Sequence, residues 1–583
     1  MEVVRPTFGM LDYCIFAIVL IVSIGIGIRM HFTGSASPEA YLMGNRSFGP
    51  YPVAVSLLSS FISAIGVLGY SGEAYAYGTQ MFMFVIGISL GIVAAEIIFL
   101  PVIYSLKLTS VNEYPEIRFK SSCLRTCLSF ISVIQGLLYM AVCLYAPTIA
   151  LQSVTPISSQ TYIFILGSIC TFYSTIGGIR AIVWTDVFQL SVMFLGLCLV
   201  IFIGCWEIGS LKKVFEIAYE GGRLNIFNMD PSLTVRHNFY NTIGFGFFFY
   251  SSAYGVTQMN VQRISSVRTM QDAKTVLRWN ILGSFLIHVL IFFGGVMAYA
   301  TYNGCDPLTL GKIKRKEEIL TYFVIDRLQF IPGLPGVFVA VILGGTLSSL
   351  SSIISAQVAM LWKDILIKFK YFANASPQRA TIYIKCLSLA NGCTIMGVAF
   401  LVSKAKNLVQ LSYTFLGITH GCMYGVFLLG FLFPKCNIKG VWTGFIISTM
   451  FIAWISTGSF IYGKNADYLK LNADNCSATS FVTNAPNSTL ESEIYLSIPQ
   501  EALNKDVSSE EGFVLLNLYR ISYTLYPVIG PIICVIVGLI VSYLTGNEKL
   551  ENVSSELITP LVRKWYWKKQ ELEEIYHVKD SPL

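Results

Sequence analysis

The chain has 583 residues, of which 54% are hydrophobic and only 13% are charged, and its mean hydropathy is +0.63. Soluble domains carry about 25% charged residues, so the composition excludes an ordinary soluble domain and indicates a polytopic membrane protein. The net charge of +7 is spread over loops between apolar stretches, and we interpret it as a determinant of topology and not as a nucleic-acid-binding surface.

About 20 apolar residues are needed to cross a bilayer. On that scale the sequence predicts an all-α protein with about thirteen transmembrane helices, at residues 9–29, 50–76, 81–107, 127–153, 160–176, 183–206, 240–262, 276–302, 335–362, 381–402, 409–433, 440–462 and 524–545. No CxxC, HExxH, Walker or GxGxxG motif appears in a suitable context. We therefore expect neither an enzyme nor a nucleotide or transition-metal site.

The loops predict the orientation of the chain in the membrane. The connections at 30–49, 108–126, 263–275, 363–380 and 434–439 are rich in Lys and Arg, which is typical of the cytoplasmic side. The polar loop 463–523 contains glycosylation sequons at Asn475 and Asn487 and is therefore expected to be extracellular. Thirteen spans then place the N-terminus outside and the C-terminus inside, in a plasma-membrane protein.

The charged segment 546–583 is predicted to be a cytoplasmic tail. It ends in Ser581-Pro582-Leu583, which matches the pattern of a C-terminal carboxylate captured by a scaffold protein.

The first of two unusual spans is 50–76, which begins with Pro50 and Pro52 and carries serines and glycines through its middle. Such a helix either packs closely against a neighbour or breaks to expose backbone carbonyls to a ligand. Five spans later, 240–262 is interrupted in a similar way by glycines and serines. A repeat unit with an odd number of spans is inverted in its second copy, and paired broken helices in inverted halves indicate a transporter binding site.

Five stretches resemble the sodium:solute symporter family, and within it the branch of iodide, monocarboxylate and multivitamin transporters. They are EAYAYGTQ at 73–80, TSVNEYPEIRF at 109–119, GGIRAIVWTDVFQ at 177–189, YGVTQMNVQR at 254–263 and PGLPGVFVAVILGGTLSSLSSIISA at 332–356. The resemblance implies a leucine-transporter-like core of two inverted five-helix repeats, and a solute that moves together with Na⁺. The expected divisions are a first span and cytoplasmic loop at 1–49, repeats at 50–206 and 240–433, an extracellular loop at 207–239, two further spans at 434–545 and the tail at 546–583.

The resemblance also implies an Na⁺ site. Na⁺ is a hard cation that prefers oxygen ligands, which a broken helix and neighbouring serines can provide. The family motif falls on the carbonyls of Ser59, Ile62 and Gly345 and the hydroxyls of Ser348 and Ser349. The alternative is that these serines bond back to carbonyls within their own helix.

The same broken helices are expected to form the solute pocket, with the candidate residues Phe61, Gly66, Phe84, Tyr250, Tyr254, Gln258, Tyr413 and Thr414. For each aromatic residue the alternative is ordinary packing between helices. The sequence departs from the common family pattern at Thr257, where an acidic or amide residue often precedes the Gln. No Lys or Arg lies near the middle of spans 50–76, 240–262 or 409–433, so an anion would be held by helix N-termini, hydroxyls and the bound Na⁺. A neutral solute fits the same pattern.

Four ionisable residues within spans need an explanation. Asp186 lies either on the exit path of Na⁺ or in an ion pair with Arg263 or Arg180. Glu96 is costly in a membrane and must be protonated, paired or exposed to water. For His288 and His420 a hydrogen-bonded structural role is expected.

Together these features predict a secondary-active symporter that imports a small organic or inorganic anion with Na⁺ by alternating access. The candidate solutes are a monocarboxylate, a vitamin of the biotin or pantothenate type, or an iodide-like ion. The alternative is a channel-like protein or sensor that binds Na⁺ or solute on the same scaffold without coupled transport.

Overall fold

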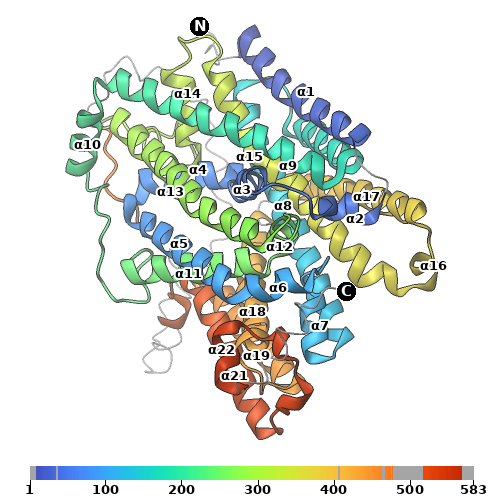
Figure 1. Cartoon of the computed structure of the whole chain (residues 1–583). Coiled ribbons are helices and arrows are strands. Elements are labelled where there is room, and N and C mark those ends of the chain that lie inside the picture. Colours follow the sequence, from blue (N-terminus) through green and yellow to red (C-terminus); the bar gives the residue numbers. More distant parts are fainter. Residues whose placement is uncertain are drawn as a thin grey trace.

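The computed structural model describes residues 8–33, 37–404, 408–462, 467–474, 476 and 517–567. These residues are nearly all helical, and their only β-type pairing is an isolated bridge between Phe48 and Val267. The helices surround a central group in which α3 (Pro50–Phe61), α4 (Ala64–Tyr77) and α15 (Leu334–Met360) lie (Figure 1). The predicted all-α architecture is therefore confirmed.

Nine helices in the described ranges are long and apolar enough to cross a membrane, and the bent pair α3 and α4 makes a tenth. All thirteen predicted spans coincide with a helix, half of a helix or a broken pair. Besides those above, the helices concerned are α1 (Met10–Thr33), α5 (Phe84–Ala94) with α6 (Leu100–Leu106), α8 (Ser122–Val154), α9 (Ser159–Ile208), α11 (Phe239–Val256) with α12 (Gln258–Ile264), α13 (Met270–Thr301), α17 (Pro377–Lys404), α18 (Leu408–Leu432), α19 (Ile438–Tyr462) and α21 (Tyr526–Leu544).

Helix α9 contains two predicted spans, 160–176 and 183–206, because the chain changes direction at Gly178 without leaving the helical hydrogen-bond pattern. Gly178 has φ 57° and ψ −156°, which a residue with a Cβ adopts only with strain. A Cβ here would also lie 2.8 Å from the backbone oxygen of Tyr41. Both constraints require glycine at this bend.

Short elements join the spans: α2 (Pro38–Met43), η1 (Gly44–Arg46), η2 (Thr79–Met83), the π turn η3 (Ala95–Phe99), α7 (Glu113–Phe119), α10 (Leu211–Glu220), η4 (Lys316–Glu318), α14 (Ile319–Arg327), the π turn η5 (Leu361–Ile365), η6 (Leu366–Lys368), α16 (Lys370–Ala373), η9 (Tyr523–Leu525), η10 (Leu550–Asn552), η11 (Ser555–Leu557) and α22 (Pro560–Tyr566). Of these, α10 lies in the loop 207–239, and η10, η11 and α22 lie in the predicted tail.

Helix α15 is the interior helix of the molecule, since 89% of its most apolar window is buried. It contacts α1, α3, α4, α8, α9 and α17. A helix without a charged face, as this one is, belongs in a core. Helices α19 and α21 pack on each other and on α18 at the periphery (Figure 1). The serine run of α15 therefore lies against the broken helix pair at the centre.

Candidate ion and solute site

The first broken span changes direction by 60° between α3 and α4. Ile62 and Ser63 leave the helical conformation there, with ψ angles of 83° and 164°. The Ser63 hydroxyl accepts a hydrogen bond from Gly66 N at 3.3 Å and so caps α4. The last carbonyls of α3 consequently have no partner in a continuing helix, as the serines and glycines of this span predict.

Helix α15 places its serines against these carbonyls. Ser348 Oγ donates to the Ser59 oxygen at 3.0 Å, and Ser349 Oγ donates to the Ser60 oxygen at 3.1 Å. A Cβ on Gly345 would lie 2.8 Å from the Ile62 oxygen, so the backbones touch only because this residue is glycine. The structure thus brings together the five residues predicted for Na⁺.

The alternative for Ser348 and Ser349 was that each hydroxyl bonds to a carbonyl of its own helix. In the structure both hydroxyls donate to carbonyls of α3. Ser348 Oγ also approaches its own-helix Gly345 oxygen at 3.3 Å, but the shorter contact crosses to α3. The Ser59 hydroxyl is buried and has no hydrogen-bond partner among the described residues.

A polar network lies one helical turn before this cluster on α3. Asp186 Oδ2 accepts from Ser56 Oγ at 2.6 Å and from Arg263 Nη2 at 3.1 Å. The Arg263 guanidinium also donates to Ser352 Oγ at 2.5 Å, and Ser352 lies 2.7 Å from Ser60 Oγ. Asp186 and Arg263 are fully buried or nearly so. Of the partners considered for Asp186, the structure selects Arg263.

The second broken span is interrupted at Thr257, which has φ −86° and ψ 128° between α11 and α12. The residue that departs from the family pattern is therefore the one at the break. Asn260 Nδ2 donates to the Ala253 oxygen at 2.7 Å and satisfies a carbonyl that the break releases. The Gln258 amide bonds to the backbone of Thr109 and Val111, both at 2.7 Å, and so holds α12 to the loop before α7.

A cavity of about 1150 Å³ lies between the two broken spans and α8, α15 and α18. Four predicted solute residues line it: Phe61, Gly66, Tyr250 and Gln258. The remaining lining is mostly aromatic and aliphatic, which is typical of a site for a small molecule. Ser60 and Ser63, the chain neighbours of the Na⁺ candidates Ser59 and Ile62, also line it, so these candidates lie beside the cavity.

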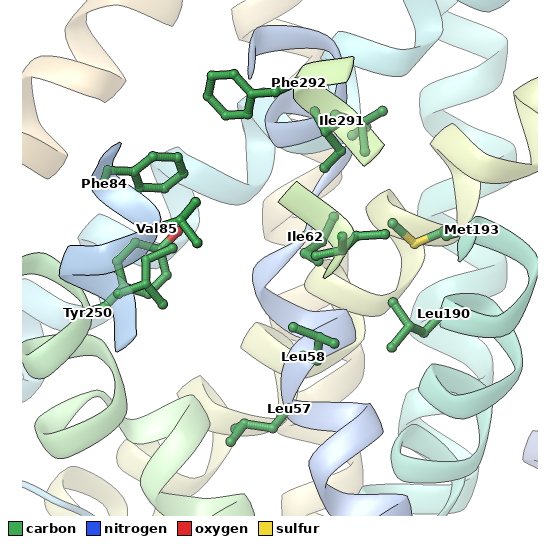
Figure 2. Close-up of a cluster of buried hydrophobic side chains, with 14 of the residues drawn as sticks. Leu57, Leu58, Ile62, Phe84, Val85, Leu190, Met193, Tyr250, Ile291 and Phe292 are labelled. Atoms are coloured by element: carbon green, nitrogen blue, oxygen red, sulfur yellow. The ribbon is translucent and has the colours of Figure 1, made fainter. Parts of the chain in front are cut away.

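Two other predicted residues support the wall from behind and are not among the lining residues. Tyr254 stacks on Phe61 with ring centroids 4.7 Å apart, and its hydroxyl donates to Asn280 at 3.0 Å. Phe84 is fully buried and packs against the rings of Tyr70 and His288, both at 5.1 Å. Figure 2 shows Phe84 and Tyr250 on one side of α3, and Leu190 and Met193 of α9 on the other.

Several predicted residues lie outside the described part of the structure. Tyr413 and Thr414 belong to α18, but their side chains are not described. Asn475, Asn487 and the terminal Ser581-Pro582-Leu583 also fall outside the described residues.

The remaining ionisable residues have identifiable surroundings. Glu96 lies in the π turn η3 and forms an ion pair with Arg278 of α13, with Oε1 2.7 Å from Nη2. Of the three alternatives for this carboxylate, the structure therefore shows the paired one. His288 Nδ1 lies 2.7 Å from the Ser284 oxygen, which is the expected structural role. His420 lines the cavity and stacks on Phe249.

A cluster at the far end of α4 was not predicted. Glu73 Oε1 accepts from Arg236 Nη2 at 2.7 Å and also from Lys316 Nζ. The two cations lie 4.5 and 4.6 Å from the centroid of the Tyr77 ring. Burial lowers the pKa of the adjacent His237 to about 4. These contacts tie α4 to the segments before α11 and α14, and no sequence pattern links the three charged residues.

A disulfide joins Cys305 to Cys476 near the same end. The segment that leads to Cys476 crosses α4, since Leu469 N donates to the Ala76 oxygen at 3.0 Å and Asp306 N donates to the Asn472 oxygen at 3.1 Å. The pairing was not predicted, because the cysteines are scattered singly. A usable signal was that both cysteines lie in long polar loops.

The model of the sodium:solute symporter family matches residues 41–448, which is more than half of the chain. The chain belongs to the sodium:solute symporter family. As a member of this family it is a transporter and not an enzyme, and Na⁺ is the co-transported ion.

Curated relatives cover nearly the whole of this symporter. Sodium-coupled monocarboxylate transporter 2 of Bos taurus is 34% identical over 97% of the chain and 89% of its own length. Sodium-coupled monocarboxylate transporter 1 of Homo sapiens is 35% identical over 93% of the chain and 88% of its own length. The sodium/iodide cotransporter of Homo sapiens is 34% identical, with coverages of 95% and 86%.

A solved structure of a Na⁺-coupled sialic acid symporter, in a substrate-bound outward-open state, shares the fold of this symporter. The TM-score is 0.72, the sequence identity is 20%, and the match covers 93% of this chain and all of the other. The leucine-transporter-like fold predicted from the sequence is thereby confirmed.

Proposed function

We propose that this symporter imports a small anion together with Na⁺ across the plasma membrane by alternating access. The anion is a monocarboxylate, an iodide-like ion or a vitamin of the biotin or pantothenate type. The observation that carries the proposal is the contact of Ser348 on α15 with the Ser59 carbonyl of the broken span, beside the cavity. Relatives at 34–35% identity that are named for monocarboxylates and iodide support the solute class.

Na⁺ is held, in this proposal, by the carbonyls of Ser59, Ile62 and Gly345 and the hydroxyls of Ser348 and Ser349. The ion would replace the hydroxyl-to-carbonyl bonds between α3 and α15 by ion-to-oxygen contacts from both helices. It would therefore stabilise one arrangement of α3 against α15 and couple ion occupancy to the shape of the adjacent cavity.

The solute would occupy the cavity between Phe61, Gly66 and Tyr250. Gly66 leaves space, and the two rings, whose centroids are 5.6 Å apart, offer apolar surface to the body of a small acid. The positive charge of the neighbouring Na⁺ would favour an anion over a neutral solute of the same shape. Asp186, whose partner Arg263 also bonds to Ser352, would lie on the path by which Na⁺ leaves.

The test is solute uptake with current recording in oocytes that express the whole chain. The panel is lactate, butyrate, iodide, biotin and pantothenate, each in Na⁺ and in choline. We expect uptake of at least one anion in Na⁺ only, and its loss in a Ser348→Ala/Ser349→Ala variant that still reaches the surface. Uptake unchanged in choline would contradict the proposal, and Na⁺ currents without solute uptake would favour a channel-like protein.

For the orientation, we propose an extracellular N-terminus and a cytoplasmic C-terminus. Disulfides persist in oxidising compartments, and four predicted spans separate Cys305 from Cys476, which puts both loops on one side. Labelling of intact cells with a membrane-impermeant maleimide after reduction should modify these two cysteines. If the maleimide modifies these cysteines only in permeabilised cells, the orientation is the opposite of the one proposed.

The proposal also covers the loop 463–523 and the C-terminus. Asn475 and Asn487 would carry N-linked glycans, which predicts a mobility shift after glycosidase treatment that disappears when both are changed to Gln.

The Ser581-Pro582-Leu583 terminus would bind a scaffold protein. Deletion of these three residues should then shorten the surface lifetime of the protein without changing its transport kinetics.

A further inference from the structure

His420 occupies a distinctive place on the cavity wall. One face of α18 lines the cavity through residues spaced three and four apart, namely Gly417, His420, Met423, Tyr424 and Phe427. The imidazole is therefore presented to the same space as Phe61 and Tyr250, within the membrane-spanning part of the molecule.

The ring of His420 is held from one side. It stacks on Phe249 of α11 with centroids 4.5 Å apart and planes inclined by 30°. Its Nε2 lies 3.5 Å from the Phe249 oxygen, so Nε2 carries the hydrogen in that contact. The structure gives Nδ1 no hydrogen-bond partner in the part of the chain that it describes. In the neutral ring Nδ1 is then an acceptor, and it becomes a donor only when the ring gains a second proton.

The distribution of charged side chains along the cavity shows why a second proton on His420 would matter. The ionised side chains among the described lining residues are Glu73, Lys312, Arg315, Glu317 and Glu318, and all belong to the end of α4 or to the segment before α14. The titratable lining groups on the elements around His420 are the phenols of Tyr139, Tyr145, Tyr250, Tyr424, Tyr523 and Tyr526. Phenols stay neutral near physiological pH, whereas imidazole changes charge there.

We propose that His420 is a specificity-determining residue that takes up a proton as a small monovalent anion enters the cavity. The Nδ1–H group then donates to the anion, and the imidazolium compensates its single negative charge. The inference rests on the proposed anion symport and adds to the charge of the Na⁺ a cationic side chain, which the middles of spans 50–76, 240–262 and 409–433 otherwise lack in the form of Lys or Arg.

Protonation and anion binding favour each other in this arrangement. A cation without a partner is costly at membrane depth, so the empty cavity keeps the ring neutral, and the anion supplies the partner that makes the charged ring stable. Such coupling is reciprocal: the anion raises the affinity for the proton, and the proton raises the affinity for the anion by the same factor. The apparent affinity for the anion should therefore increase as the pH falls.

The test measures the KM for lactate, or for the best anion of the panel, from about pH 8 to about pH 5.5 at saturating Na⁺. Uptake in choline is subtracted at each pH. In the wild-type protein we expect the KM to fall by about fivefold to tenfold, which corresponds to about 1 to 1.4 kcal/mol of coupling. In His420→Gln, which retains a donor but does not titrate, the KM should be independent of pH. His420→Asn serves the same purpose if the Gln variant does not reach the surface.

The matched control is His288→Gln, because His288 is an intramembrane histidine whose Nδ1 already faces the Ser284 oxygen and which is not among the cavity-lining residues. This variant should retain the pH dependence of the KM. The same pH dependence in wild type and in His420→Gln would overturn the inference while leaving Na⁺-coupled anion uptake intact. Absence of Na⁺-dependent uptake of every anion at every pH would overturn the proposed function and this inference together.

Discussion

The hydroxyl of Ser348 lies 3.0 Å from the carbonyl oxygen of Ser59, across the boundary between α15 and the broken span. We predict that Ser348→Ala raises the Na⁺ concentration for half-maximal uptake by at least about tenfold, since about 1.4 kcal/mol of ion binding would be lost. The control is Thr346→Ala, whose hydroxyl bonds to Ile342 in its own helix at 3.0 Å. An equal effect of both variants would argue against a site for Na⁺ at Ser348.

Gly345→Ala is predicted to abolish uptake with the protein still folded. The new Cβ would lie 2.8 Å from the Ile62 oxygen and 2.9 Å from Ala64 N, so α15 and the break must move apart and the oxygen ligands with them. The matched control is Gly397→Ala in α17, where a Cβ meets nothing within 4 Å. Uptake should be measured together with surface expression, and normal Na⁺ affinity in Gly345→Ala would refute the prediction.

Asp186→Asn is predicted to destabilise the protein, because it leaves the buried guanidinium of Arg263 without a counter-charge. Removing one member of a buried pair costs about 3 to 5 kcal/mol. The double variant Asp186→Asn/Arg263→Gln should recover part of this loss. The measurement is the thermal unfolding midpoint in detergent, compared with Arg180→Gln, which leaves the pair of Asp186 and Arg263 in place.

A pH dependence of stability is predicted from His237, which precedes α11 and lies 2.9 Å from the Tyr523 hydroxyl through Nε2. Burial lowers the pKa of this histidine from 6.5 to about 4. The unfolded chain therefore binds the proton more readily, and stability falls as the pH decreases from about 6.5 towards 4. The effect reaches about 3 kcal/mol and is absent above pH 7. His237→Gln should flatten the dependence of the unfolding midpoint in this range, and an unchanged slope would contradict the assignment.

Much of the fold followed from the sequence because spans and breaks leave local patterns. Apolar stretches located the helices to within a few residues, and the serines and glycines of 50–76 marked the break that the structure places at Ile62 and Ser63. The ion-site residues could be named because a family motif covers them, and the structure places Ser348 against the Ser59 oxygen, while their role as Na⁺ ligands stays a prediction.

The features of the site that were not predicted depend on contacts between residues that are far apart in the sequence. Gln258 lines the cavity as expected, but the bonds of its amide to the backbone of 109–111 were not predicted, because only the packing of α12 on that loop determines them. Tyr254 and Phe84 support the wall from behind it, because helical rotation decides which aromatic ring faces the cavity. The ion cluster of Glu73 joins residues more than 160 positions apart, and no local pattern records such a pairing.

The disulfide between Cys305 and Cys476 spans 171 residues of sequence, and this separation constrains biosynthesis. Cys305 is translated before α15, α17, α18 and α19, and its partner follows all four helices. The bond can form only after both thiols have reached the same compartment, so Cys305 must remain reduced while these helices are inserted. A ribosome-arrested nascent chain that ends before residue 476 should therefore lack the disulfide that anchors the segment crossing α4, whatever the state of its helices.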